Sequence, residues 1–410
     1  KQLFGYEQVA KADCEYPLTG IIKKMIKTQE HIMKKENRDK IVALRHDLHC
    51  HPELSMQEQE TKNRLITFIK ENIQLEVIDR GNWFYVQYTT KRQSEMPEAD
   101  TKPPIAFRAD FDALPILEDA ESLPYASENP GVSHKCGHDG HASALAGLAL
   151  ELDANGADRD VYLIFQHAEE IGRGAQECVP LIKEKKIAEI YGFHNWSGFP
   201  KGAVVLREGV SQCASRGLTI TFTGKKSHAS IPEQGKNPSV AIAKLILYVQ
   251  NLLQATTFEQ LVLATIVNVE IGTKDFGISA GEGEISFTLR AALQRELDEL
   301  EQMIRTQAEK FAAEEGLQLS YAYDDPFPET ANDAKAIERV RNAAEKLHLP
   351  VVELTEPLRA SEDFGYYTKE CPGAMFYLGN GEDYPALHTP EYDFRDELLE
   401  LAVNIFQKLI

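Results

Sequence analysis

The sequence predicts an α/β protein in which a second, α+β domain is inserted into the first. Segments typical of strands and of helices alternate in both terminal parts of the chain, as in a sheet covered by helices on two faces. The continuous apolar run at 161–165 is typical of a strand buried on both faces. The central part has a different order of elements, and 410 residues exceed one ordinary domain. We therefore expect two domains.

The elements of the first domain follow from short apolar patterns. Apolar residues recur at helical spacing within 21–33 and 41–48, so the chain is expected to be helical up to about residue 75. A small, apolar segment at 142–152 predicts a helix packed closely behind a loop rich in glycine and histidine. Strands are expected at 84–88, 105–108, 161–165, 190–193, 350–354 and 374–378, and a last helix from about residue 396.

The inserted domain begins with a segment, 218–223, in which apolar and polar side chains alternate, and this predicts a half-exposed strand. A helix at 238–253, strands at 261–271 and 285–293, and a helix at 298–315 follow. Closed by a final strand, this order is that of a ferredoxin-like sandwich. The predicted boundaries are 214–323 for the inserted domain and 1–213 with 324–410 for the first.

Composition restricts the class of partner and the compartment. A formal net charge of −20 argues against nucleic acid or an anionic membrane as a partner. No apolar run reaches the roughly 18 residues of a membrane-spanning helix, and the first residues lack the apolar core of a signal peptide. Six cysteines are scattered without the spacing of a disulfide framework, which favours a reducing, cytoplasmic location.

Five side chains from four short segments form a candidate metal site. They are Cys136, His138, Glu170, His194 and His388. Thiolate, imidazole and carboxylate together suit zinc, manganese, cobalt or nickel better than magnesium or calcium. Five donors exceed the four of a closed structural zinc site, so the sequence indicates either two ions or one open catalytic ion.

The Cys136–His138 pair has two interpretations. In an extended segment the two side chains share one face, so both can reach one ion or an adjacent pair of ions. The alternative is a buried free cysteine beside surface histidines, which is the commoner case for an isolated pair. Three histidines and Asp139 crowd the loop at 134–141, and this favours a site.

Glu169 and Glu170 follow the buried strand at 161–165, at the end of an α/β sheet where ligands bind. In an extended chain the two carboxylates point in opposite directions, so one can bind metal while the other faces the substrate water. A glutamate beside a metal-activated water is the usual general base of metallohydrolases. The alternative is a solvated acidic pair at a strand end.

Three further side chains carry open alternatives. His228, in the inserted domain, can donate a hydrogen bond to a developing oxyanion or simply end a strand. Asp110 and Asp112 follow a strand and can orient a ligand histidine, or merely cap the turn. His194 and His388, taken singly, indicate little.

The ordered set of motifs resembles a known superfamily. The matching segments are 48–55 with Glu58 and Thr61, then 108–115, 136–141, 361–364 and 388–394. Together they resemble the co-catalytic metallopeptidase superfamily of aminoacylases and zinc carboxypeptidases. They are most similar to its amidohydrolase branch, which includes indoleacetyl-amino-acid and hippurate hydrolases. The resemblance runs from about Arg45 to the end of the chain.

The resemblance implies a zinc-peptidase-like α/β/α catalytic domain and an inserted ferredoxin-like lid domain that often dimerises. It implies two divalent metal ions held by the five candidate ligands. Cys136 stands about where the zinc peptidases place a bridging aspartate. Asp110 stands where they carry a ligand histidine, and His138 would compensate.

The resemblance also assigns roles around the ions. Glu169 would be the general base, Asp112 would support the centre, and His228 would stabilise the oxyanion, either within the chain or across a dimer interface. Arg290 matches a lid arginine that meets the substrate carboxylate in relatives. An asparagine that often assists substrate binding is replaced in the segment 277–280, which departs from the family pattern.

The function expected from these observations is a metal-dependent amidohydrolase that cleaves the amide bond of N-acyl amino acids or similar small conjugates. A metal-activated water would attack the carbonyl, with Glu169 as general base. A dipeptidase or carboxypeptidase of the same superfamily is the alternative. A metal-loaded binding protein without turnover is a further alternative, although it has no need of the base Glu169.

Overall fold

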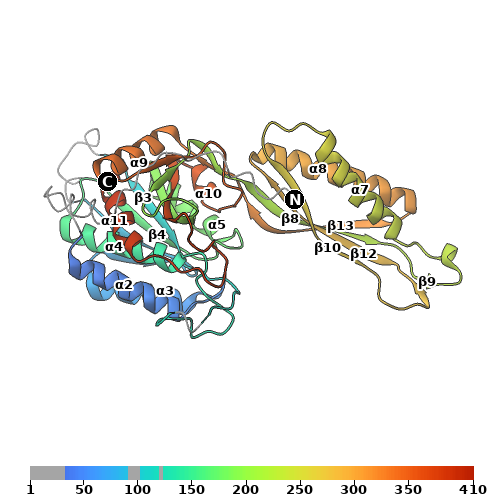
Figure 1. Cartoon of the computed structure of the whole chain (residues 1–410), viewed down its shortest axis with the longest axis horizontal. Coiled ribbons are helices and arrows are strands. Elements are labelled where there is room, and N and C mark those ends of the chain that lie inside the picture. Colours follow the sequence, from blue (N-terminus) through green and yellow to red (C-terminus); the bar gives the residue numbers. More distant parts are fainter. Residues whose placement is uncertain (1–32, 91–101, 120–122) are drawn as a thin grey trace.

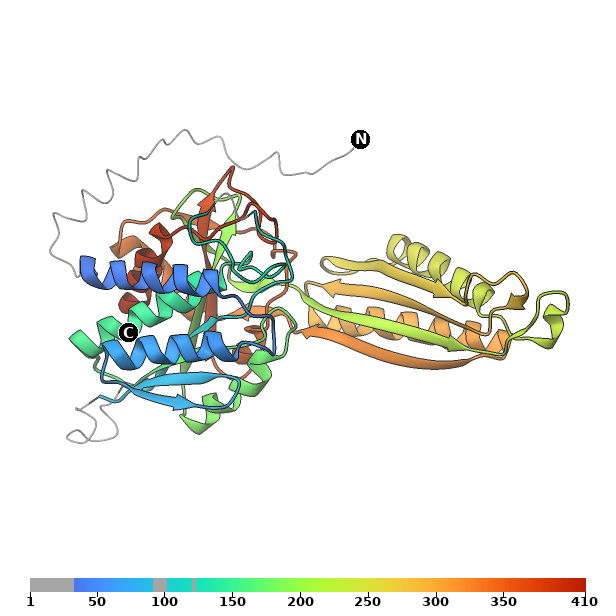
Figure 2. The same cartoon turned by 90° about the horizontal axis from the view of Figure 1, so that it is seen from below.

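The chain forms two lobes that lie end to end (Figure 1). This computed structural model describes residues 33–90, 102–119 and 123–410, and the helix expected within 21–32 lies outside them. The larger lobe contains both terminal parts of the described chain, and the second lobe is formed by its central part (Figure 2). Among the described helices, none is long and apolar enough to cross a membrane.

Within the described residues, the larger lobe is built on an eight-stranded sheet of order β1-β2-β4-β3-β5-β16-β6-β15. The neighbours β4, β3, β5 and β16 run parallel to one another. Their carboxyl ends therefore meet at one edge of the sheet, where open α/β sheets bind ligands. The strands are β1 (Glu76–Asp79), β2 (Phe84–Tyr88), β3 (Ile105–Asp110), β4 (Val161–Gln166), β5 (Glu189–Ser197), β6 (Val204–Leu206), β15 (Val351–Glu353) and β16 (Gly373–Gly381).

Helices cover both faces of this sheet, as the sequence predicts for an α/β/α domain. Val161, Leu163 and Phe165 of β4 belong to one hydrophobic cluster, and Tyr162 and Ile164 to another on the opposite face. The first face packs against α2 (Lys35–Cys50), α3 (Gln59–Asn72), α4 (His138–Asn155), α9 (Ala334–Lys346) and α11 (Glu397–Leu409). The second packs against α5 (Gly174–Cys178), α6 (Pro180–Glu184) and α10 (Gly365–Thr368).

The second lobe has an antiparallel four-stranded sheet of order β10-β12-β8-β13 with its own hydrophobic core. Helices α7 and α8 lie on one face of it (Figure 1). The order strand, helix, strand, strand, helix, strand is ferredoxin-like. The elements are β8 (Ala214–Thr223), α7 (Ser239–Ala255), β10 (Val262–Ile271), β12 (Glu282–Ala291), α8 (Gln294–Glu315) and β13 (Gln318–Phe327). A short pair, β9 (Ser227–His228) with β11 (Ile278–Ser279), extends from this sheet.

A buried arginine in β3 connects the sheet to a distant segment. The Arg108 guanidinium is 1% exposed and contacts Asp110 Oδ2 at 2.6 Å and Asp363 Oδ1 at 2.7 Å. Its Nη2 also lies 3.1 Å from Glu362 Oε1, and its Nε donates to Gln166 Oε1 at 2.9 Å. These contacts hold the segment 361–364 against the ends of β3 and β4.

We predict that Arg108→Met lowers the free energy of unfolding by about 3–5 kcal/mol, because it leaves buried carboxylates without their cation. Urea denaturation followed by circular dichroism measures the change. Arg341→Met is the control, because Arg341 pairs with Glu353 at the surface and such pairs contribute about 1 kcal/mol or less. An equal loss of unfolding free energy in the two variants would contradict the stabilising role of Arg108.

Candidate metal centre

The five side chains predicted to bind metal converge at the carboxyl edge of the parallel strands. Cys136 directly precedes α4, and His138 is the first residue of that helix. Glu170 follows β4, His194 lies in β5, and His388 lies in the segment after β16. The fold therefore brings together residues that lie up to 252 positions apart in the sequence.

The distances between their ligand atoms are short. The Cys136 Sγ lies 3.2 Å from His388 Nε2 and 3.4 Å from His194 Nε2. The Glu170 Oε1 lies 3.7 Å from His138 Nε2 and 3.7 Å from His388 Nε2. The donors form two groups, Cys136 with His138 and His194, and Cys136 with Glu170 and His388, each with its ligand atoms within 4.8 Å of one another. The sulfur of Cys136 is common to both groups.

Two buried polar atoms without a hydrogen-bond partner among the described residues indicate that this cluster can bind cations. The His138 Nε2 and the Glu170 Oε1 are buried and accept or donate no hydrogen bond. Buried polar atoms are rarely left without a partner in native proteins. Two divalent ions beside these atoms would satisfy them, and the sulfur, nitrogen and oxygen donors suit such ions.

Hydrogen bonds on the far side of the histidine rings orient the ligands. The His138 Nδ1 lies 3.0 Å from Asp112 Oδ1, and the His194 Nδ1 lies 2.7 Å from the carbonyl oxygen of Asn195. When Nδ1 donates to these acceptors, each Nε2 presents a lone pair to the cluster. Asp112 Oδ2 also accepts the backbone N–H of Glu170 at 3.0 Å. Asp112 thus contacts two of the predicted ligands.

The expectation that Cys136 and His138 share a face of an extended segment is wrong. Gly137 between them has a φ of 99°, and α4 begins at His138. The two side chains converge through this left-handed turn instead. A Cβ at position 137 would clash with the Asn195 amide, so glycine is required for the close approach.

The expectation that Glu169 and Glu170 point in opposite directions is also wrong. The chain turns at Ala168, whose φ is 47°, rather than continuing as a strand. The Glu169 Oε2 lies 3.9 Å from His138 Nε2, close to the 3.7 Å of Glu170 Oε1. Both carboxylates therefore reach the ligand cluster. Glu169 is 5% exposed and is not a solvated surface acid.

Burial and crowding of acidic groups shift the pKa values in the cluster. Burial, with Glu362 and Glu170, raises the pKa of Glu169 well above its usual value. Burial raises the pKa of Glu170 to about 7, although His138 opposes the shift. Burial and the two glutamates raise the pKa of the Cys136 thiol. Burial lowers the pKa of His194 and of His388. Divalent cations reverse this preference for the neutral acids, because they favour thiolate and carboxylate.

His138 behaves differently from the other two histidines. Burial lowers its pKa, but Asp110 and the hydrogen bond to Asp112 outweigh burial and raise it to about 10. His141, on the next turn of α4, is engaged on both nitrogens, by Asp110 Oδ1 at 2.6 Å and by Asn195 Oδ1 at 2.7 Å. His141 is therefore held by the protein and has no free nitrogen for an ion.

No role was predicted from the sequence for the acids that surround Glu169. Glu169, Glu362 and Asp363 have carboxylate oxygens within 4.8 Å of one another, and the Asp363 N–H lies 3.4 Å from Glu169 Oε1. Arg108 contacts both Glu362 and Asp363. Glu362 and Asp363 belong to the 361–364 motif, so that motif was the available signal. Its partner Arg108 lies 255 residues away from Asp363, and no local pattern connects them.

The two predicted site residues of the second lobe lie in different places. The Arg290 Nη1 donates to Ser361 Oγ at 2.6 Å, so Arg290 lies where the lobes meet. His228 is exposed and lies in β9, at the end of the second lobe that is far from the larger lobe (Figures 1 and 2). Within this chain the structure does not bring His228 to the metal ligands.

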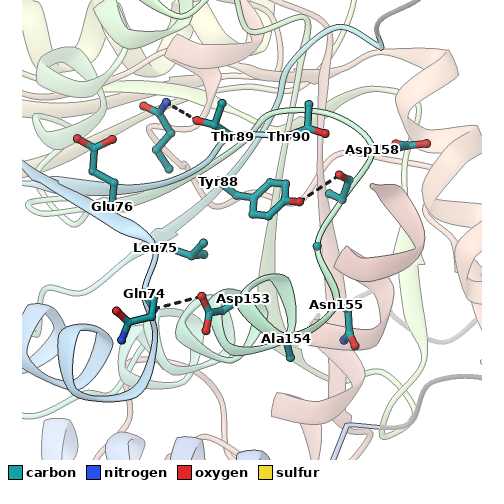
Figure 3. A pocket seen from close by; sticks show the side chains of 13 residues that line it. Gln74, Leu75, Glu76, Tyr88, Thr89, Thr90, Asp153, Ala154, Asn155 and Asp158 are labelled. Carbon is teal, nitrogen blue, oxygen red and sulfur yellow. Dashed lines mark hydrogen bonds between the residues drawn. The ribbon is translucent and has the colours of Figure 1, made fainter. Parts of the chain in front are cut away.

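A hollow of about 860 Å³ lies elsewhere, where β1, β2 and the end of α4 meet (Figure 3). None of the 13 residues that line it is a histidine or a cysteine. Asp153 there accepts the backbone N–H of Gln74 at 3.1 Å, and Asp158 pairs with Lys102 at 2.7 Å. The hollow contains none of the predicted site residues, and we assign it no role in the chemistry.

Known proteins resemble this chain over most of its length. An N-acetylcysteine deacetylase of Bacillus subtilis is 31% identical over 374 residues, which cover 90% of this chain and 96% of that protein. An N-acetyldiaminopimelate deacetylase of Exiguobacterium sibiricum is 29% identical over 371 residues, covering 89% of this chain and 96% of that protein. The crystal structure of a dinuclear metal-binding peptidase of the M20 family from Bacillus subtilis superposes with a TM-score of 0.76 at 28% identity, over 92% of this chain and 98% of that one.

The model of peptidase family M20/M25/M40 matches residues 106–410, which contain both groups of ligands and the second lobe. The matched residues make up most of the chain, and the deacetylases match nearly its whole described length. This protein, a hydrolase of amide bonds, therefore belongs to peptidase family M20/M25/M40.

Proposed function

We propose that the protein hydrolyses the amide bond of N-acyl amino acids with the help of two divalent metal ions. The observation that carries this proposal is the pair of donor groups that share Cys136, with the Glu169 carboxylate beside them. Relatives that deacetylate N-acetylcysteine and N-acetyldiaminopimelate support the choice of substrate class. The donors suit zinc, manganese, cobalt or nickel.

In this proposal, Glu169 transfers the proton of the reaction. Ions held by Cys136, His138, Glu170, His194 and His388 would polarise the carbonyl and lower the pKa of water. Glu169 takes a proton from the water as its oxygen attacks the carbonyl carbon. Glu169 then gives that proton to the nitrogen as the carbon–nitrogen bond breaks, leaving a carboxylate and an amine. Burial keeps the proton affinity of Glu169 high, which suits a group that must hold and return a proton.

Arg290 is our candidate for binding the carboxylate of the amino acid. It is half-buried where the lobes meet, and burial lowers its pKa. Among the described residues, the Arg290 guanidinium donates a hydrogen bond to the neutral Ser361 hydroxyl. The positive charge of Arg290 is therefore available to a substrate anion. A guanidinium at this place would hold the substrate between the lobes.

The position of His228 supports a homodimer formed through the second lobe. An exposed histidine at the far end of that lobe can act on substrate only in another subunit. The edge strand β10 exposes Val267 and Val269, at 60% and 40%, and so offers an apolar surface. We propose that His228 stabilises the oxyanion in the partner's site.

We further propose a reducing, cytoplasmic location, because Cys50, Cys136, Cys178, Cys213 and Cys371 are all free thiols. Cys14 lies outside the described residues. An oxidising compartment would put the thiolate ligand at risk.

Glu169→Gln tests the proposed general base. The variant keeps the shape of the side chain but cannot accept a proton, so we expect kcat to fall by roughly 10²–10⁴-fold. Amine release from a panel of N-acetyl, N-benzoyl and indoleacetyl amino acids, with dipeptides included, measures it. The bound metal, determined by elemental analysis, should stay at two ions per chain. Wild-type activity in this variant would reject the mechanism.

Removal of single ligands tests the shared sulfur. Cys136→Ala should lose both ions, because both donor groups contain Cys136. His194→Ala and His388→Ala should each weaken one site and leave about one ion per chain, because each histidine belongs to one group. Elemental analysis after dialysis against a weak chelator distinguishes the variants. Loss of both ions in all three variants, or one ion left in Cys136→Ala, would contradict the arrangement.

Mixing inactive variants tests the role of His228 across the dimer. His228→Ala and Glu169→Gln should each be inactive alone, and mixed dimers should regain activity in the site that combines Glu169 with the partner's intact histidine. Unfolding and refolding the two variants together forms these dimers, and amine release measures them. The expected recovery is about a quarter of wild type for random mixing of equal amounts. No recovery in mixed dimers of confirmed composition would place His228 outside the site.

A further inference from the structure

Glu58 occupies the cap position of α3 but does not cap that helix. Its side chain makes no capping hydrogen bond. Another glutamate of the same loop, Glu53, performs that role, because its Oε2 accepts the backbone N–H of Thr61 at 2.7 Å and the Thr61 hydroxyl at 2.9 Å. The Glu58 carboxylate, 5% exposed, is therefore free to serve elsewhere.

The Glu58 carboxylate reaches instead to the turn that carries the two site glutamates. Its Oε1 accepts the backbone N–H of Ala168 at 2.8 Å, across 110 residues of sequence. Burial, with the nearby Asp112 carboxylate, raises the pKa of Glu58 to about 7. Burial of a carboxylate is unfavourable unless hydrogen bonds replace the lost hydration, and the Ala168 N–H supplies one such bond.

The turn itself needs support. Ala168 has a φ of 47°, is fully buried, and has the Cβ that makes a left-handed conformation unfavourable by about 1–2 kcal/mol. Such residues persist where surrounding contacts hold them. The carbonyl of Ala168 accepts the N–H groups of Arg173 and Gly174, at 3.2 and 3.0 Å, so the contact with Glu58 leaves both backbone polar groups of this residue hydrogen-bonded.

The same loop also supports the other end of the turn. The Ser55 hydroxyl donates to Asp112 Oδ2 at 2.7 Å, and that oxygen accepts the N–H of Glu170 at 3.0 Å. The loop between α2 and α3 thus holds the turn at Ala168 directly and at Glu170 through Asp112. Glu169 lies between these two fixed points.

We propose that Glu58 is a positioning residue, which holds the turn 168–170 so that Glu169 and Glu170 both face the metal cluster. Its effect on turnover rests on the proposed function, whereas its effect on the turn does not. Removing a group that orients the residues of a metal site typically reduces affinity or activity by about 10–100-fold.

Three substitutions separate positioning from mere stability. Glu58→Gln keeps the length and an acceptor oxygen, Glu58→Asp keeps the charge but is too short to reach Ala168, and Glu58→Ala removes both. Glu53→Ala is the matched control, because it removes a carboxylate of the same loop that caps α3. Hydrogen–deuterium exchange of the peptide 166–174 reports the turn, and kcat and KM for N-acyl amino acids report turnover.

We expect Glu58→Asp and Glu58→Ala to exchange faster at 166–174 and to lower kcat by about 10–100-fold with little change in KM. Glu58→Gln should behave nearly as wild type, and Glu53→Ala should exchange faster only at the start of α3. If Glu58→Ala does not fold, the comparison of Glu58→Gln with Glu58→Asp decides.

Unchanged exchange at 166–174 in Glu58→Asp would overturn the proposal, as would faster exchange there with an unchanged kcat. Faster exchange in Glu58→Asp but not in Glu58→Gln, in a protein that hydrolyses none of the amides, would instead reject the proposed function and retain the contact.

Discussion

One buried guanidinium holds together the acids that converge where β3 and β4 end. Each carboxylate that leaves water costs several kcal/mol unless a cation or several donors replace the lost hydration. Arg108 supplies that replacement to Asp110, Glu362 and Asp363 at once. The position of Glu169 depends on this arrangement, because the Asp363 N–H lies against its carboxylate. The contacts of Arg108 thus stabilise the ends of the central strands and also hold the segment that lies against Glu169.

The cluster of candidate ligands, taken with Asp112 and Glu169, contains more acidic groups than histidines that could neutralise them. Asp112 and Glu170 approach His138, and the Cys136 thiol and Glu169 add two further groups that lose a proton when an ion binds. Burial opposes that loss while the cluster holds no cation. Binding of the ions and release of protons are therefore coupled, and the affinity for metal should fall as the pH is lowered.

The periodic apolar patterns of the sequence predicted the strands and helices. Features that depend on contacts between distant residues could not be predicted. The α/β order, the strand at 161–165 and the α/β/α layers followed from the apolar pattern. The prediction that five donors share one site came from the resemblance to family motifs, and only the glutamates were placed at a strand end from the apolar pattern. The turns at Gly137 and Ala168 could not be predicted, because nothing in their neighbours demands a positive φ. The contact of Arg108 with Asp363 spans 255 residues, and the remoteness of His228 depends on how far the second lobe extends.

The order of the two lobes along the sequence determines which of them can fold first during synthesis on the ribosome. The sheet of the second lobe is made from the continuous stretch 214–327, so it can form as soon as that stretch has emerged. The larger sheet cannot close so early, because β16 lies between β5 and β6 and is synthesised long after both. His388 emerges later still, after every other ligand. The group of Cys136, Glu170 and His388 is therefore completed only after the second lobe has been synthesised, and a nascent chain that stops before residue 388 would contain a folded second lobe but lack the last candidate ligand.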